Sequence, residues 1–197
     1  MPVGHVLEAG VLQSRDTVAL ARALLGKLLV SGDAGGTVRA LRICEVEAYH
    51  GEADLACHAS KGRTARTEVM YAAGGVWYVY LCYGIHEMLN LVTGPAGQPS
   101  AVLIRGLEGI TGPGRLTRAL GITRQFNAQP VTPATGLWLE DDGFRPPRAA
   151  VQATPRIGVD YAGEWAEKPW RFYYTPSDAG PKEVTAAAPI PRVRRKE

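Results

Sequence analysis

Two glutamates alternate with apolar residues in Arg42-Ile43-Cys44-Glu45-Val46-Glu47-Ala48-Tyr49, the end of a strand predicted to begin at Thr37. The side chains of a strand alternate between its two faces, so Glu45 and Glu47 are expected to point the same way. An aromatic residue, Tyr49, follows directly. A carboxylate held near aromatic surfaces and basic residues is suited to activating water beside a nucleobase, which gives a first hypothesis about the chemistry.

Further strands are predicted on both sides of this stretch in the chain. Lys27–Val30 precedes it and is expected to pair with it as a hairpin. Val76–Tyr83 and Ile85–Val92 meet at a glycine, and Ala101–Leu107 follows after a short connection, which indicates an antiparallel meander. We therefore predict a mixed α/β (α+β) fold: a single domain with a curved, mainly antiparallel β-sheet, flanked by helices and carrying a protruding β-hairpin.

Two helices are predicted beside this sheet. Asp16–Leu25 begins with a capping residue and is followed by Gly26, and Arg115–Leu120 follows a Gly-Pro-Gly turn. Residues 50–75 are polar and irregular, which indicates a loop.

The C-terminal part has weaker patterns. Residues 130–155 are rich in proline and are predicted to form loops, except for a strand at Leu137–Leu139. Residues 191–197 are basic and are predicted to form a flexible tail. No internal repeat or linker divides the chain, so residues 1–190 are predicted to form the single domain.

Composition narrows the class of protein. Of the 197 residues, 46% are hydrophobic and 21% are charged, as in a folded chain rather than a disordered one. We expect no signal peptide, and the longest apolar run, Val76–Leu81, is too short to span a bilayer. The three cysteines form no CxxC pair, which favours a reducing compartment. A cytoplasmic protein without a membrane association is therefore expected.

The net charge is only +3, but the charges are unevenly distributed. Between Lys61 and Arg124, basic residues outnumber acidic ones, which suits a polyanion such as nucleic acid because phosphate contacts release counterions. An ordinary solvated surface explains the same charges equally well.

Glu47 and Arg105 are the candidates for catalysis. A general base needs a carboxylate that can reach water and is screened from bulk solvent, whereas a surface ion pair needs neither. Arg105 closes the apolar run Ala101–Ile104. An arginine in such a place is rarely buried unpaired, so Arg105 would either orient a carboxylate and its water or form a structural ion pair.

Nearby aromatic and polar residues are candidates for binding a base. Tyr49 and Tyr80 would present flat rings, although aromatic residues also occur in strands for packing alone. Tyr83 lies at the predicted hairpin tip, where an exposed ring would act as a wedge between bases. His58 and Asn90 would read a base edge, or instead cap a loop and bind backbone.

Motifs for cofactors are missing from the sequence. The four histidines show no HxH or HExxH spacing, and neither a P-loop nor a dinucleotide-binding glycine motif occurs. We therefore expect neither a metal nor any other cofactor.

Six motifs follow one another along the chain from about residue 10 to residue 174. They are Arg42–Tyr49, Ala56–His58, Tyr78–Gly84 with Asn90, Val102–Glu108, Gly112–Leu116, and Arg156–Val159 with Gly163–Pro169. In this order they resemble the alkyladenine (3-methyladenine) DNA glycosylase family. Any one motif is a weak signal, whereas six in sequence are specific.

The resemblance implies a monofunctional enzyme of base excision repair. Such an enzyme flips an alkylated or deaminated purine out of duplex DNA and hydrolyses its N-glycosidic bond, which leaves an abasic site. By this resemblance Glu47 would deprotonate the attacking water, Arg105 would hold that water, and Tyr83 would fill the gap left in the duplex.

The resemblance also implies a base pocket and a DNA-binding surface. The pocket would be formed by Tyr49, His58, Tyr80, Asn90 and Ile157. Candidates for contacts to the DNA backbone are Lys61, Arg63, Arg66, Arg118 and Arg156. The expected partner is double-stranded DNA with damaged purines, bound by a monomer.

Two other functions stay open at this point. A non-catalytic module that binds damaged DNA would use the same basic loop and Tyr83. A glycoside hydrolase that used Glu45 and Glu47 as acid and base is disfavoured, because neighbours on one strand are poorly placed to flank a sugar from both sides.

Overall fold

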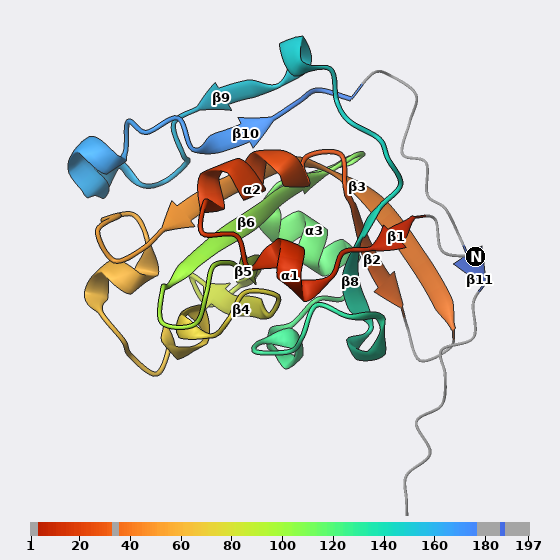
Figure 1. Ribbon diagram of the computed structural model, residues 1–197, viewed down its shortest axis with the longest axis horizontal. Coiled ribbons are helices and arrows are strands. Elements are labelled where there is room, and N and C mark those ends of the chain that lie inside the picture. Colours follow the sequence, from red (N-terminus) through yellow and green to blue (C-terminus); the bar gives the residue numbers. More distant parts are fainter. Residues whose placement is uncertain (1–3, 33–35, 177–185, 188–197) are drawn as a thin grey trace, which may run out of the picture.

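An open antiparallel sheet forms the centre of the computed structural model, which describes residues 4–32, 36–176 and 186–187 (Figure 1). Its main path runs through β1 (His5–Val6), β8 (Leu137–Asp141), β2 (Leu28–Gly32), β3 (Thr37–His50), β6 (Ser100–Leu107), β5 (His86–Val92) and β4 (Trp77–Cys82). All strand pairs in the described ranges are antiparallel.

Four short strands attach to this path. β7 (Ile110–Thr111) pairs with β6, and β11 (Ala186–Ala187) pairs with β3. β10 (Arg171–Tyr173) pairs with the later half of β3 and with β9 (Gln152–Thr154). The later half of β3 is therefore flanked on both edges, by β6 and by β10.

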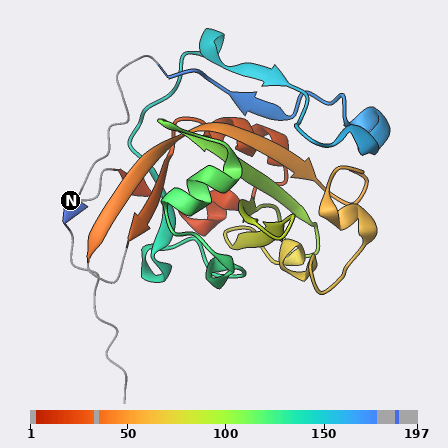
Figure 2. The same ribbon diagram turned by 180° about the vertical axis from the view of Figure 1, so that it is seen from behind.

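Helices cover both faces of the sheet. α1 (Ala9–Leu12) and α2 (Thr17–Leu24) lie in front of it in Figure 1, whereas α3 (Pro113–Ala119) lies behind it and comes to the front in Figure 2. α2 packs on β3 and β6, and α3 packs on β5 and β6. Short 3-10 turns occur at His58–Lys61, Glu68–Tyr71, Arg124–Phe126, Pro133–Thr135, Arg148–Ala150 and Asp160–Trp165.

Local sequence explains where α2 begins and ends. The carboxylate of Asp16 accepts a hydrogen bond of 2.8 Å from the backbone amide of Ala19, which caps the first turn. Leu20 and Leu24 lie on one face of the helix and are buried in the core. Gly26 has a φ of +85°, which suits glycine and lets the chain turn directly into β2.

Alternation along β4 and β5 separates a core face from a second face of the sheet. Trp77, Val79, Leu89 and Leu91 are buried in the main hydrophobic core. The residues between them point the other way, because successive side chains of a strand face opposite sides. This second face carries the candidate site.

A β-bulge adjusts the same alternation in β3. The register with β6 shifts around Glu45, so Ile43 and Val46 both enter the main core although they are three residues apart. The extra residue turns Glu45, Glu47 and Tyr49 toward the second face. The i and i+2 spacing predicts the shared side of the two carboxylates, whereas the bulge sets which side that is.

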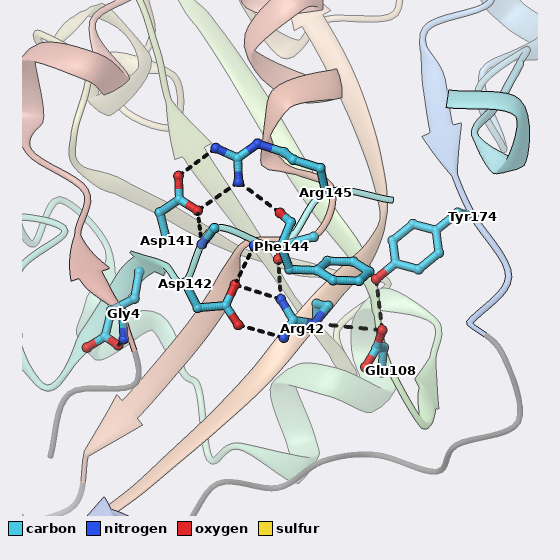
Figure 3. A network of polar contacts seen from close by, with 11 residues as sticks. Gly4, Arg42, Glu108, Asp141, Asp142, Phe144, Arg145 and Tyr174 are labelled. Carbon is cyan, nitrogen blue, oxygen red and sulfur yellow. Dashed lines mark hydrogen bonds and ion pairs between the residues drawn. The ribbon is translucent and has the colours of Figure 1, made fainter. Parts of the chain in front are cut away.

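A polar network around Arg42 fixes β3 just before the bulge (Figure 3). Arg42 donates two hydrogen bonds, of 3.0 and 2.7 Å, to the carboxylate of Asp142, and these bonds lower the pKa of that carboxyl. Its guanidinium also lies 3.9 Å from Glu108, which accepts a hydrogen bond of 2.9 Å from the hydroxyl of Tyr174. The backbone amide of Tyr174 in turn donates to the carbonyl of Cys44, inside the bulge.

The predicted fold is confirmed: a single α/β domain with a mainly antiparallel sheet, flanking helices and a β4–β5 hairpin. Several short elements were missed, among them two strands that pair with each other. Residues 152–154 form a strand within the proline-rich stretch, and residues 171–173 form its partner. The predicted tail, residues 191–197, lies outside the described residues, as does residue 190, the predicted end of the domain.

Candidate active site

A pocket of about 570 Å³ opens on the second face of the sheet. The five residues predicted to bind a base all line it: Tyr49, His58, Tyr80, Asn90 and Ile157. Arg105 and Tyr83 line it too. The structure therefore brings the predicted pocket residues together around one cavity.

No helix in the described ranges is long and apolar enough to cross a membrane.

The carboxylate of Glu47 lies beneath this pocket and is completely buried. Its Oε2 accepts a hydrogen bond of 2.8 Å from the hydroxyl of Tyr49 and one of 3.3 Å from Nη1 of Arg105. Its Oε1 accepts a hydrogen bond of 2.8 Å from the backbone amide of Ile157. Glu47 is thus not the solvated surface residue that its sequence position also allowed.

The contact with Glu47 changes the ionisation of Tyr49. Burial of the ring, together with the negative charge of Glu47, raises the pKa of Tyr49 well above its ordinary value. The tyrosine hydroxyl therefore keeps its proton and donates a hydrogen bond to the carboxylate of Glu47. A donated hydrogen bond of this kind orients the carboxylate without removing its charge.

Four charged side chains form a row of alternating sign below the pocket. Arg105 donates to Glu47 and, through Nε at 3.0 Å, to Glu45. Arg171, from β10, donates to the same oxygen of Glu45 at 2.7 Å. Burial alone would lower the pKa of Arg105, but the two carboxylates outweigh it and raise that pKa. Arg105 therefore holds both glutamates at once.

Three aromatic side chains form one wall of the pocket. The imidazole of His58 lies 4.7 Å from the ring of Tyr80, and its Nδ1 lies 3.0 Å from the hydroxyl of Tyr78. Tyr78 and Tyr80 are two positions apart on β4 and present their rings to the same face, with centroids 5.2 Å apart. Burial lowers the pKa of His58 to about 4, and the positive charge of Arg66 contributes. His58 is therefore neutral near pH 7.

Asn90 lies beside this wall on β5 and is buried. Its amide nitrogen donates to the carbonyls of Tyr78, at 3.2 Å, and of Met88, at 3.3 Å. These two bonds hold the amide group in one orientation at the floor of the pocket.

Tyr83 occupies the tip of the β4–β5 hairpin and is 92% exposed. A hydrogen bond of 3.1 Å from the amide of Ile85 to the carbonyl of Cys82 closes the turn. Tyr83 and Gly84 both have positive φ values, 51° and 73°, as in the turns that match the twist of a hairpin. A large side chain held in a conformation that L-residues rarely adopt, and exposed beside a pocket, indicates a functional constraint.

Arg156 does not reach the surface, which corrects its prediction as a phosphate contact. Its guanidinium is fully buried and contacts both oxygens of Asp54, at 2.5 and 2.8 Å. It also donates to the carbonyls of Ala48, at 2.9 Å, and Trp165, at 3.0 Å. Arg156 precedes Ile157, so this buried pair positions the backbone amide that binds Glu47.

The other predicted backbone contacts are exposed side chains. Lys61, Arg63 and Arg118 lie at the surface, and Arg63 forms an exposed ion pair with Glu68 at 2.6 Å. Arg66 is also exposed, but it lines the base pocket. The loop predicted between residues 50 and 75 therefore contributes both surface charges and part of the pocket.

Sequence reasoning missed three residues of the site: Asp54, Arg171 and Tyr161. Asp54 pairs with Arg156 and Arg171 pairs with Glu45, and both come from segments without a recognisable pattern. Tyr161 is 70% exposed and lines the same pocket as Tyr83. The motif that contains Arg156 was the only available signal for this side of the pocket. In the described ranges, no group of three or more His, Cys, Asp or Glu side chains could hold a metal ion.

Comparison with known proteins assigns this chain to a family. The profile of the family described as methylpurine-DNA glycosylase (MPG) matches residues 11–112 and 109–178. A protein of Psychrobacter cryohalolentis is 44% identical over 191 residues, which covers 82% of this chain and 89% of that protein. Proteins of Myxococcus xanthus and Methanocella arvoryzae are both 49% identical, over 170 and 179 residues. Each of these alignments covers 81% of this chain, with 86% of the first protein and 88% of the second. All three are provisionally named 3-methyladenine DNA glycosylases.

Proposed function

Because the chain belongs to the methylpurine-DNA glycosylase family, we propose that it extrudes an alkylated or deaminated purine from duplex DNA and hydrolyses the N-glycosidic bond by means of Glu47. The membership confirms the enzyme class, a DNA glycosylase of base excision repair that hydrolyses N-glycosyl bonds. The mechanism rests on one observation above all: a buried carboxylate, held by Tyr49, Arg105 and the amide of Ile157, beneath a pocket of the right kind for a base.

Glu47 acts as the general base in this proposal. It takes a proton from a water molecule while the oxygen of that water bonds to C1′ of the extruded nucleotide. The C1′–N bond breaks, and its electron pair leaves with the base. A carboxylate oxygen accepts more than one hydrogen bond, so Oε1 keeps capacity for water beside the Ile157 amide. Because Glu47 has no exposed surface, the water must enter as the extruded nucleotide opens the contacts around the carboxylate.

Arg105 acts on Glu47 rather than on the base. It donates a hydrogen bond to the Glu47 carboxylate, and its second contact with Glu45 fixes its position. Glu45 is then a positioning residue, held in turn by Arg171. For a cationic purine a single carboxylate is enough for the hydrolysis, because such a base is already a good leaving group.

The aromatic wall binds the extruded base. Stacking of a base on an aromatic ring contributes about 1–3 kcal/mol, and Tyr49 and Tyr80 offer such rings within one pocket. His58 is neutral, and because its Nδ1 contacts the hydroxyl of Tyr78, its Nε2 is left to donate or accept one hydrogen bond at a base edge, according to the tautomer. Asn90 borders the floor of the pocket, where it would clash with a purine that carries a larger substituent. Ile157 contributes an apolar contact from the opposite side.

Tyr83 fills the space that the extruded nucleotide leaves. Unstacking costs a few kcal/mol, and an inserted side chain offsets this cost with new contacts. Damaged purines pair weakly and are therefore extruded more readily than normal ones. The exposed side chains of Lys61, Arg63 and Arg118 would bind phosphates of double-stranded DNA, and in this proposal the protein acts as a monomer. Such an enzyme works in the compartment that holds the DNA.

Hydrolysis by water, without a covalent intermediate, fits the residues around the pocket. A glycosylase that uses an amine nucleophile, such as that of a lysine, places this amine at the reacting carbon. No lysine lines this pocket in the described part of the chain. The products are therefore the free base and an intact abasic strand.

The experiment is to incubate the protein with duplexes that each contain 3-methyladenine, 7-methylguanine, hypoxanthine or ethenoadenine. Abasic sites are measured by strand cleavage in hot alkali, and a parallel sample without alkali detects any lyase activity. The proposal expects base release from at least one lesion and intact strands without alkali. A protein that bound these duplexes but released no base would instead be a damaged-DNA-binding module.

A further inference from the structure

Arg66 lies at the mouth of the base pocket. Its side chain lines both the main pocket and a smaller one of about 180 Å³ next to it. The guanidinium carbon lies 4.9 Å from the centroid of the Tyr80 ring, within the range of a cation–π contact. A base stacked on the aromatic wall would therefore lie close to a positive charge that is never lost, since arginine stays protonated.

The positive charge of Arg66 affects groups inside the pocket. The imidazole of His58 lies 4.7 Å from the same Tyr80 ring, and Arg66 is the charged side chain that disfavours its protonation, after burial itself. A second positive charge on His58 is thus opposed by Arg66. A positive charge on an extruded base would be opposed in the same way.

Arg66 also carries a positive charge that no carboxylate of the site balances in the described part of the chain. The carboxylates of Glu45 and Glu47 are matched by the guanidinium groups of Arg105 and Arg171. Arg66 has no carboxylate within ion-pair distance in the described part of the chain. Its neighbour Arg63, on the same loop, is by contrast paired with Glu68.

We propose that Arg66 sets the charge preference of the pocket, favouring uncharged damaged purines over cationic ones. This inference rests on the proposed base-excision function and names its substrate class more closely. A deaminated purine such as hypoxanthine is uncharged, whereas an N7-alkylated guanine carries a positive charge.

The preference holds through the whole reaction. As the C1′–N bond breaks, negative charge flows onto either base, so the charges of the two bases differ by one unit at every stage. Arg66 therefore discriminates between them by the same electrostatic energy in the extruded state and in the transition state. For charges a few Å apart at a partly solvated site, this energy corresponds to a rate ratio on the order of tenfold.

The test compares two lesions in two variants. Single-turnover rates of base release are measured at pH 6, where 7-methylguanine is cationic, for duplexes with 7-methylguanine or hypoxanthine. We expect Arg66→Gln to raise the ratio of the 7-methylguanine rate to the hypoxanthine rate by on the order of tenfold. The matched control, Arg63→Gln, removes a charge from the same loop outside the pocket and is expected to leave this ratio unchanged.

Two results would overturn the inference. An unchanged ratio in Arg66→Gln would mean that Arg66 acts on phosphates alone, because phosphate contacts affect both lesions equally. The second concerns binding without catalysis, measured by NMR titration with the 7,9-dimethylguanine cation and with 9-methylhypoxanthine. Equal changes in affinity for both compounds in Arg66→Gln would contradict the charge preference. If the wild-type protein released no base at all, the proposed function would fail, while the titration would still decide the role of Arg66.

Discussion

Replacing Arg156 by alanine is expected to destabilise the protein strongly, because Asp54 would be left charged and buried. Both side chains are completely buried, and the guanidinium contacts the two oxygens of Asp54 at 2.5 and 2.8 Å. Two further bonds, to the carbonyls of Ala48 and Trp165, would be lost with it. Breaking such a buried pair from one side costs about 3–5 kcal/mol. With an m-value of about 2 kcal/mol/M, the urea midpoint should fall by about 2 M.

An exposed ion pair of similar geometry serves as the control. Arg63 contacts the two oxygens of Glu68 at 2.7 and 2.6 Å, but these side chains are 60% and 57% exposed. Arg63→Ala should leave the urea midpoint nearly unchanged, because solvent screens this pair. Equal shifts for Arg156→Ala and Arg63→Ala would refute the reasoning, since burial is the difference between them.

A double-mutant cycle completes this test. Asp54→Ala combined with Arg156→Ala removes both charges, so the double variant should lose less stability than the sum of the two single variants. Strictly additive losses would show that the pair is not coupled. The positioning role has a separate readout: in Arg156→Lys, base release should slow more than DNA binding weakens, because the amide of Ile157 shifts relative to Glu47.

Three further predictions concern pH, the hairpin tip and the bulge. Because the pKa of His58 is lowered to about 4, the unfolded chain binds a proton that the folded protein rejects between that pH and the ordinary histidine value of 6.5. Stability should therefore fall as the pH drops from 6.5 to 4, and the fall should be smaller in His58→Gln; NMR titration of the ring checks the pKa directly. Tyr83→Ala should keep the free energy of unfolding within about 0.5 kcal/mol of the wild-type value but slow base release from a well-paired lesion more than from a mismatched one. Gly106→Ala would place a Cβ 3.0 Å from that of Glu45 and 3.3 Å from the sulfur of Cys44. It should cost about 1–3 kcal/mol in urea unfolding and slow base release through the displaced carboxylate, whereas an unchanged rate would show that the bulge tolerates movement.

Much of the sheet could be predicted because its strands are long and alternate clearly. Thr37–His50 alternates between core and outer positions over several stretches, as do both strands of the β4–β5 hairpin, and a glycine marks the turn between β4 and β5. The strands at residues 152–154 and 171–173 are three residues long and have no such period. Their pairing depends on contacts far along the chain, which a local pattern does not report.

The site was predicted unevenly for a similar reason. Glu47 and Arg105 lie on patterned strands, and their spacing and apolar neighbours drew attention to them. Arg156 was misplaced, because an arginine in a loop reads as exposed, while its partner Asp54 lies about a hundred residues earlier. The surplus charge of Arg66 is likewise visible only when the loop is seen against the aromatic wall.

The central claim is that Glu47 is the general base and Glu45 is not. The direct test measures single-turnover base release and lesion-DNA affinity for Glu47→Gln beside Glu45→Gln, which alters a carboxylate on the same strand that shares Arg105. Urea unfolding of both variants controls for loss of structure. The account predicts that Glu47→Gln keeps lesion binding and loses base release by a factor of at least about 100, the lower range for a lost general base, while Glu45→Gln retains most of the rate. Base release at the wild-type rate by a folded Glu47→Gln protein would contradict it.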